Sequence, residues 1–322
     1  MNRQEVRDLL PMRSCMEILA NAFQAYSNGE SVQPLRTMMK IPARNDILAT
    51  MPGYDGSSQS LAVKLITVFH NAGEMGFDSH QGLVILFSAE HGNPLAIMDA
   101  IEITAIRTAA ASGVATKALA REDGSTLAIL GAGVQAKTHF DAMKEARSVR
   151  SVRIWNRSRD RAEKLTTELS KGTPLDITVA DSPQTAVSDA DLICTVTAVA
   201  EPILKGEWLQ PGAHVNAVGS STPTRRELDT EAIVKSKLFT DSRESILNEA
   251  GDFIIPRSEG AVGDDHVLGE IGEVLTGKVT GRLHPNEITL FKSLGMAIED
   301  VAVAHFIYEE AMAGSRGTWF DI

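Results

Sequence analysis

Residues 127–140 read LAILGAGVQAKTHF, and this run restricts the fold more than any other part of the chain. Its four leading apolar residues predict a buried parallel strand, and Gly131, Gly133 and Ala136 precede a helical pattern. A bare G-x-G-x-x-A match fits an ordinary turn, but between a strand and a helix it is the dinucleotide fingerprint. Gly131 permits the tight turn, Gly133 admits a pyrophosphate to the helix N-terminus, and Ala136 allows close packing. We therefore expect a nucleotide site here.

Strands and helices alternate after this motif, which predicts a Rossmann-type doubly wound parallel sheet with helices on both faces. The expected strands are 127–130, 152–155, 177–180, 192–197, 214–218 and 237–240, with helices over 134–147 and 158–171. Towards the C-terminus the pattern predicts helical pieces around 244–250 and 266–276 and a long helix over 285–312.

The N-terminal third has a different pattern, which predicts a mostly antiparallel α+β domain. A helical segment over 4–29 precedes several extended runs between 34 and 98, and an alanine-rich helix follows over 100–121. The long C-terminal helix can return to pack on this part. We therefore expect a substrate-binding and dimerisation domain made of 1–119 plus 300–322, with a dinucleotide-binding Rossmann domain, 120–299, inserted into it.

Composition narrows the function to that of a soluble enzyme. The 322 residues are 43% hydrophobic and 23% charged, and no apolar run approaches the ~20 residues that span a bilayer. The net charge of −11, without a basic cluster, argues against a nucleic-acid partner. A polar N-terminus without a signal-peptide core favours a cytoplasmic protein. The two cysteines and eight histidines form no ligand-spaced pair, so we expect no metal.

The end of the second expected Rossmann strand bears on the choice of nicotinamide cofactor. An acidic residue at this position would bind the ribose 2′-hydroxyl of NAD. The chain has Asn156, Arg157 and Ser158 instead, and these residues can receive the 2′-phosphate of NADP. In the alternative reading Ser158 caps the next helix and Arg157 lies in solvent. We expect NADP, with NAD as the alternative.

Three cationic side chains stand in apolar surroundings and predict a site for a carboxylate. Lys64 lies within SLAVKLITVF, where a lysine is either on an exposed edge strand or functional, because an unpaired buried ammonium is costly. Arg107 lies in the alanine-rich helix and needs an anionic partner there. Arg36, in PLRTMMKIP, is the third candidate.

The chain resembles the ornithine cyclodeaminase/mu-crystallin family, and within it the mu-crystallin (ketimine reductase) branch. The matching segments run in family order along nearly the whole chain, and they include QPLRTMMKIP, ATMPGY, AVKLIT, AIMDAIEITAIRTAAASGVATKAL, LAILGAGVQAKTH, VRIWNRS, AEPILKGEWLQPGAHVNAVGSSTP, GEIGEVLTGK and FKSLGMAIEDVAVA. The resemblance implies this family's fold, a nicotinamide cofactor and a homodimer that forms through the sheet of the first domain.

The resemblance also implies roles for particular residues. Arg36 and Arg107 would clamp the substrate carboxylate, with Thr108 beside Arg107, and Lys64 would lie next to the reacting C–N bond. The implied cofactor-binding residues are Gly131, Gly133, Val134 and Gln135 for the pyrophosphate, Asn156, Arg157 and Ser158 for the adenosine ribose, Thr195 and Thr197 along the groove, and Val218, Gly219, Ser293 and Leu294 at the nicotinamide, the last two from the start of the C-terminal helix.

One position departs from the cyclodeaminases and related alanine dehydrogenases of the family, which carry an Asp where this chain has Ser221. A cyclodeaminase must move protons on and off nitrogen, for which a carboxylate is suited, whereas a serine without an adjacent base does not ionise near neutral pH. Reduction of an imine demands less of this position, and mu-crystallin-like members also carry Ser here. In the alternative reading Ser221 only stabilises a turn before Pro223.

These observations predict an NAD(P)H-dependent reductase of small α-imino acids, an oxidoreductase acting on C=N bonds to give L-amino acids. The expected substrate is a ketimine such as pyrroline- or piperideine-2-carboxylate, or an acyclic imine. If Lys40, Arg44 or Arg225 reached the pocket, a second carboxylate, as in iminosuccinate, would fit. The alternatives are a cyclodeaminase or alanine dehydrogenase-like deaminase with bound NAD, a hydroxyproline dehydratase, and a non-catalytic NADPH-binding protein.

Overall fold

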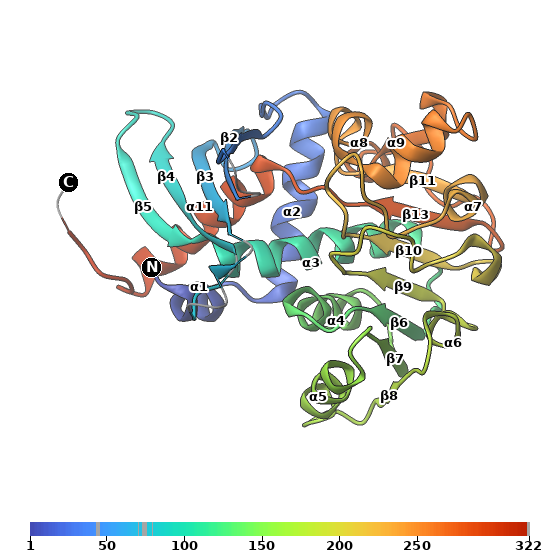
Figure 1. The fold of residues 1–322 in the computed structure, drawn as a ribbon. Helices are drawn as coiled ribbons and strands as arrows, with labels where there is room; N and C mark the ends of the chain where they lie inside the picture. The colour runs from blue at the N-terminus through green and yellow to red at the C-terminus, as the bar shows by residue number, and fades with distance from the viewer. Residues whose placement is uncertain (43–45, 70, 73–75, 79, 321–322) are drawn as a thin grey trace. The chain divides into compact units, whose positions relative to one another are not determined.

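The computed structural model describes residues 1–42, 46–69, 71–72, 76–78 and 80–320. The chain forms two compact units, and the first combines Met1–Arg107 with Gly295–Ile322 (Figure 1). The second unit is Thr108–Leu294, so the boundary falls within helix α3 (Ala100–Leu119). The assignment of substrate binding and dimerisation to one unit and of the dinucleotide to the other stays a prediction.

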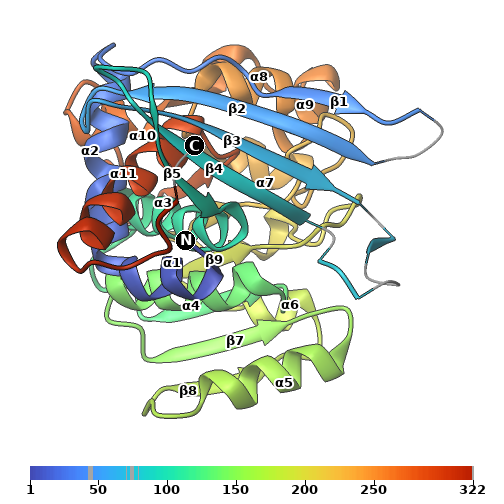
Figure 2. The same ribbon diagram turned by 90° about the vertical axis from the view of Figure 1, so that its left-hand side faces the viewer.

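The first unit is an antiparallel sheet covered by helices. Its strands follow the order β1-β2-β3-β4-β5, and Figure 2 shows the central strands side by side. Helix α11 packs against β2, β3 and α2. The bounds are α1 Arg3–Leu9, α2 Met12–Ser27, β1 Thr37–Lys40, β2 Ile47–Asp55, β3 Ser60–Val68, β4 His80–Ser88, β5 Pro94–Asp99 and α11 Ala297–Ala313.

Alternation along the strands of this sheet separates a buried face from a more open one. Ala62 and Lys64 of β3 and Val84 of β4 are buried. Leu61 and Leu83 point to the opposite face, where they are 38% and 46% exposed. This two-residue period is what an antiparallel sheet with one covered face requires.

The second unit contains a fully parallel sheet with the strand order β12-β11-β13-β10-β9-β6-β7-β8 (Figure 1). All four residues 127–130 of β6 are inaccessible to solvent, as expected for a strand covered on both faces. The strands are β6 Thr126–Leu130, β7 Ser151–Trp155, β8 Asp176–Val179, β9 Leu192–Thr195, β10 His214–Ala217, β11 Ser236–Thr240, β12 Val267–Glu270 and β13 Ile288–Lys292. The α-helices besides α3 are α4 Val134–Ala146, α5 Arg159–Leu169, α6 Pro183–Val187, α7 Thr230–Lys235, α8 Arg243–Glu249, α9 Gly251–Ser258 and α10 Ile271–Leu275.

The sequence expectations were confirmed for the fold class and were wrong near the C-terminus. The expected helix over 266–276 begins with strand β12, which pairs with β11. The expected helix over 285–312 contains strand β13, which lies between β10 and β11 near the middle of the sheet. Both strands are short, and only Lys292, Ser293 and Gly295 interrupt the apolar residues between β13 and α11, so the sequence pattern resembles one continuous helix. Gly295, at φ +78°, separates the two elements.

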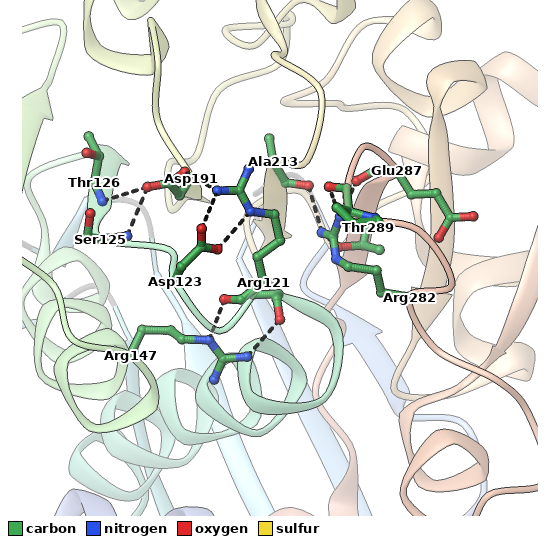
Figure 3. Close-up of polar contacts among 12 residues, drawn as sticks. Arg121, Asp123, Ser125, Thr126, Arg147, Asp191, Ala213, Arg282, Glu287 and Thr289 are labelled. Atoms are coloured by element: carbon green, nitrogen blue, oxygen red, sulfur yellow. Dashed lines mark hydrogen bonds and ion pairs between the residues drawn. The ribbon is translucent and has the colours of Figure 1, made fainter.

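The C-terminal end of α3 is held by two arginine side chains (Figure 3). Arg147 donates from Nε to the carbonyl of Arg121 and from Nη2 to that of Ala120, at 2.8 Å each. Arg282 donates from Nε to the carbonyl of Leu119 at 2.7 Å. The last carbonyls of a helix lack partners within the helix, and cationic donors suit its partial negative charge. These arginines therefore anchor α3 in the second unit. No helix in the described part of the chain combines the length and apolar character needed to cross a membrane.

A buried histidine joins α3 to α4. His139 lies 2.7 Å through Nδ1 from the carbonyl oxygen of Gln135 and 2.9 Å through Nε2 from the hydroxyl of Ser112. Because a carbonyl can only accept, Nδ1 carries the proton and Nε2 accepts from Ser112. Burial lowers the pKa of His139 to about 4. Burial, with Arg282, also lowers the pKa of His214 to about 3.

The protein should therefore lose stability in mild acid. His139 takes up a proton in the unfolded chain below its ordinary pKa of about 6.5 but in the folded chain only near 4, so stability falls as the pH drops between these values. We expect His139 to lower the free energy of unfolding by about 2 kcal/mol between pH 7 and pH 5. Urea titrations should show a flatter pH dependence in His139→Gln and no change in a His91→Gln control, whose side chain is 70% exposed. Equal slopes in wild type and His139→Gln would contradict this assignment.

Candidate active site

The parallel sheet has its topological switch point between β6 and β9. The chain continues from β6 through β7 to β8 on one side and then returns to place β9 on the other side of β6. Ligands of open α/β sheets bind at such a point, outside the carboxyl ends of the strands. The segments after β6 and β9 are therefore the place to look for a dinucleotide site.

The glycine motif after β6 has the geometry of a phosphate-binding turn. Gly131 adopts φ +136°, and a Cβ atom there would lie 2.7 Å from the carbonyl oxygen of Val196, so no larger residue fits. Gly133 is the N-cap residue of α4, and no side chain caps this helix. The first N–H groups of α4 thus remain available to an anion. Val134, in the first turn of α4, is 65% exposed.

The three residues after β7 lie at the neighbouring strand end. Asn156 donates through Nδ2 to the carbonyl of Ser158 at 3.0 Å. Arg157 and Ser158 are exposed. Ser158 occupies the N-cap position of α5, as the alternative interpretation expected, but its side chain makes no capping hydrogen bond. Its hydroxyl and the Arg157 guanidinium are therefore accessible to a ligand.

The predicted residues after β9 and β10 surround a glutamate that sequence reasoning missed. Thr195 and Thr197 both donate through their hydroxyls to the carboxylate of Glu227, at 2.7 and 2.6 Å. The Gly219 N–H donates to the same carboxylate at 2.8 Å. Val218 is half-buried beside them. The two threonine hydroxyls thus donate their protons to Glu227, and only their oxygens remain available, as acceptors, to a ligand.

Ser293 and Leu294 do not begin the C-terminal helix, as had been expected, but follow strand β13. The Ser293 N–H donates to the carbonyl of Ala217 at 3.0 Å. The Leu294 N–H donates to Asp241 Oδ2 at 2.6 Å. Asp241 directly follows β11, so these contacts tie together the ends of three neighbouring strands.

In the first unit, two cations share one carboxylate. Lys64 Nζ lies 2.7 Å from Asp300 Oδ2, and both side chains are 2% exposed. Arg107 donates from Nε to Asp300 Oδ1 at 3.0 Å and from Nη1 to Glu299 Oε2 at 2.9 Å. Lys64 lies on an interior strand, which excludes the exposed-edge alternative. The anionic partner that Arg107 required is thus supplied by α11.

Burial and neighbouring charges shift the pKa values of Lys64, Asp300 and Arg107. Burial, together with the positive charge of Arg107, lowers the pKa of Lys64 to about 8. Burial acts against the charged form of Asp300, but Arg107 and Lys64 hold the pKa of this carboxyl below its usual value. Burial likewise opposes the charge of Arg107, while Asp300 and Glu299 keep its pKa above the ordinary one. Near pH 8, therefore, Lys64 is the group of this cluster that can gain or lose a proton.

Gly295 brings Arg36 to the same cluster. Its carbonyl accepts a hydrogen bond from Arg36 Nη2 at 3.1 Å. A Cβ atom at Gly295 would lie 2.5 Å from Nη1 and 2.9 Å from Nη2 of Arg107, so only glycine leaves room for this guanidinium. Arg36 and Arg107 thus meet at Gly295, next to the carboxylates of Glu299 and Asp300. Two guanidinium groups placed in this way are suited to bind a carboxylate.

The remaining predicted positions are placed as follows. Thr108 follows Arg107 in α3 and is buried. Ser221 is exposed after β10. Of the additional cations, Lys40 and Arg225 are exposed, and Arg44 lies outside the described residues. Among the residues that the structure describes, no group of three or more His, Cys, Asp or Glu side chains could hold a metal ion.

Known proteins resemble this chain over nearly its whole length. The family model described as ornithine cyclodeaminase/mu-crystallin family matches residues 1–315. Ketimine reductase mu-crystallin of Mus musculus is 40% identical over 319 residues, covering 98% of this chain and 97% of the relative. Delta(1)-pyrroline-2-carboxylate reductase of Bacillus cereus is 35% identical over 314 residues, covering 97% and 96%. The solved structure of the Thermococcus litoralis Delta(1)-pyrroline-2-carboxylate reductase with NADH and L-proline has a TM-score of 0.96 at 38% identity, covering 99% of each chain.

Proposed function

The chain belongs to the ornithine cyclodeaminase/mu-crystallin family, and from this premise we propose that it is an NAD(P)H-dependent reductase of small α-imino acids. The substrate is a ketimine such as pyrroline- or piperideine-2-carboxylate, or an acyclic α-imino acid, and the product is an L-amino acid. The observation that carries the proposal is the buried cluster in which Asp300 pairs with both Lys64 and Arg107.

The substrate carboxylate is bound by Arg107 and Arg36. A guanidinium has five N–H donors, and the described contacts of Arg107 occupy two of them. Glu299 and Asp300 hold its plane fixed, so that little conformational freedom is lost when a carboxylate binds.

Lys64 supplies the proton. Hydride addition to the carbon of a C=N bond leaves an electron pair on nitrogen, so the nitrogen must be protonated before or during the transfer. Lys64 is protonated below about pH 8, and Asp300 fixes its Nζ at 2.7 Å. A reduced nicotinamide, when bound, would supply the hydride.

The residues of the second unit fit a dinucleotide. The close approach of Gly131 to Val196 leaves space only for a glycine turn, and the start of α4 has no side-chain cap. Gly131, Gly133, Val134 and Gln135 would hold the pyrophosphate. The residues after β9, β10 and β13 would border the nicotinamide, since these strands neighbour the switch point.

A substrate panel tests the function. Oxidation of NADPH and NADH is followed at 340 nm with pyrroline-2-carboxylate, with piperideine-2-carboxylate, and with pyruvate or oxaloacetate plus ammonia or methylamine. We expect turnover of at least one imine and little release of ammonia from ornithine or alanine with NAD. Deamination without added imine would favour the cyclodeaminase or dehydrogenase alternative. Cofactor binding without turnover of any imine would favour a non-catalytic NADPH-binding protein, and dehydration of hydroxyproline the dehydratase.

We further propose that NADPH is preferred to NADH, because Arg157 is exposed and the strand end carries no acidic side chain. Arg157→Ala is expected to weaken NADPH binding by about 10- to 100-fold, as for a lost charge-assisted contact, and NADH binding by less than about threefold. Fluorescence titration with each cofactor measures the two affinities. Arg161→Ala is the control, because Arg161 is an exposed arginine in the first turn of α5. Equal losses for the two cofactors would overturn the preference for NADP.

The protein is proposed to be a homodimer that forms through the open face of the antiparallel sheet. Leu61 and Leu83 are exposed there on neighbouring strands, and a second copy would cover them. Light scattering after size exclusion measures the mass. The double variant Leu61→Glu/Leu83→Glu is expected to shift the mass from dimer to monomer.

A further inference from the structure

Glu227 is a completely buried carboxylate in the second unit, and all of its described partners are donors. Its Oε1 accepts from the N–H and the hydroxyl of Thr197, at 2.7 and 2.6 Å. Its Oε2 accepts from the hydroxyl of Thr195 at 2.7 Å and from the N–H of Gly219 at 2.8 Å. One carboxylate thus joins the segment that ends β9 to the segment that follows β10.

The carboxylate of Asp252 binds the backbone of Glu227, and Lys292 binds both Asp252 and the backbone of Gly219. Asp252 Oδ1 accepts the N–H groups of Glu227 and Leu228, at 2.8 and 3.0 Å. Asp252 Oδ2 lies 2.9 Å from Lys292 Nζ, and both side chains are 1% exposed. Lys292 also donates to the carbonyl of Gly219. The N–H and the carbonyl of Gly219 are therefore both fixed by buried charged side chains.

We propose that Glu227 is a positioning residue that sets the two strand-end segments, 195–197 and 217–219, against the nicotinamide end of the cofactor. The inference rests on the proposed function, in which these segments border the nicotinamide. Glu227 acts through them and touches no reacting atom. Without Glu227 the Thr197 N–H would have to find water or another acceptor, and the Gly219 N–H would keep only its longer hydrogen bond, of 3.3 Å, to the carbonyl of Thr195. Both segments would then lose their fixed position.

The substitution Glu227→Gln separates this role from simple space filling. Each carboxylate oxygen receives one backbone N–H, from Thr197 on one side and from Gly219 on the other. A hydroxyl can rotate to accept a hydrogen bond, but a backbone N–H cannot. In either orientation, therefore, the glutamine NH2 group faces a backbone donor and displaces one of the two segments.

The experiment compares binding of NADH with binding of ADP-ribose, which lacks the nicotinamide, by calorimetry on wild type and Glu227→Gln. We expect NADH to bind about tenfold more weakly to the variant, because the hydrogen bonds of the charged carboxylate that fix the segments at the nicotinamide end are lost. ADP-ribose should bind within about twofold of wild type, because it makes no contact at that end. A change in the fold as a whole would weaken both ligands together. Glu270→Gln is the matched control, because the carboxylate of Glu270 accepts the Arg243 N–H and an amide oxygen can replace it.

The outcomes distinguish this inference from the proposed function. If wild type reduces an imine but Glu227→Gln leaves the ratio of the two affinities unchanged, the positioning role is wrong and the function stands. If wild type binds NADH and reduces no imine, the function fails, and the affinity ratio still tests Glu227. If Glu227→Gln does not fold, Glu227→Asp replaces it: this variant keeps the charge but is too short to reach both segments, and the same selective loss for NADH is expected.

Discussion

Replacing Arg107 by lysine is expected to reduce kcat/KM for the imino acid by about 2–5 kcal/mol in transition-state terms, or about 30- to 5000-fold. The guanidinium holds Asp300 and Glu299 with two donors and offers the others to the substrate. An ammonium has only three donors and no planar fork, so it cannot keep both of these contacts and also bind a third carboxylate with two hydrogen bonds. Steady-state kinetics with the best substrate of the panel measures the loss, which should appear mainly in KM.

Lysine is a sharper test than alanine at this position. Arg107→Ala would leave Glu299 and Asp300 with one cation fewer in a buried cluster, and such a loss costs about 3–5 kcal/mol of stability. Arg107→Lys retains the charge, and thermal unfolding verifies that the variant is folded. Arg3→Lys is the control, since Arg3 pairs with Asp78 at the surface. A kcat/KM within about threefold of wild type would remove Arg107 from the proposed carboxylate site.

The Rossmann half of the fold could be predicted because its signals are local. Each buried strand from β6 onward is followed within a few residues by a turn or a helix start. The glycine motif after β6 identifies this strand as the first of a dinucleotide-binding fold. Strands β12 and β13 were missed for the opposite reason. They have four and five residues, and their place in the sheet depends on pairing with β11, which is distant in the sequence.

In the candidate site, too, the residues with a local sequence signal could be predicted, and their partners far along the chain could not. Lys64 and Arg107 could be selected because a cation in an apolar run needs an explanation. Their partners Glu299 and Asp300 lie 192 and 193 positions after Arg107, and further still after Lys64, and were not predicted. A signal was present, since this acidic pair interrupts the otherwise apolar run MAIEDVAVA. The same signal, a charged residue within an apolar run, also marks Lys292 in ITLFKSLG.

Replacing Lys64 by methionine is expected to reduce kcat by about two to four orders of magnitude, the usual contribution of a positioned general acid. Methionine has a similar length and leaves Arg107 paired with both Asp300 and Glu299, so the cluster keeps two of its three ion pairs. Cofactor affinity should stay within about threefold of wild type, because Lys64 belongs to the first unit and the glycine turn to the second. Single-turnover kinetics with saturating NADPH measures the loss in the chemical step.

The pH profile shows whether Lys64 acts through its proton or only through its charge. Because the pKa of Lys64 is lowered to about 8, wild-type kcat/KM should be level below that pH and fall about tenfold per unit above it, as the ammonium loses its proton. Lys64→Arg keeps a cation that does not deprotonate in this range. It is expected to have low activity without the alkaline decline near pH 8, once the titration of the free substrate has been subtracted. If the arginine variant keeps wild-type activity and the same decline, the proton comes from another group, and the assignment of Lys64 as the acid is wrong.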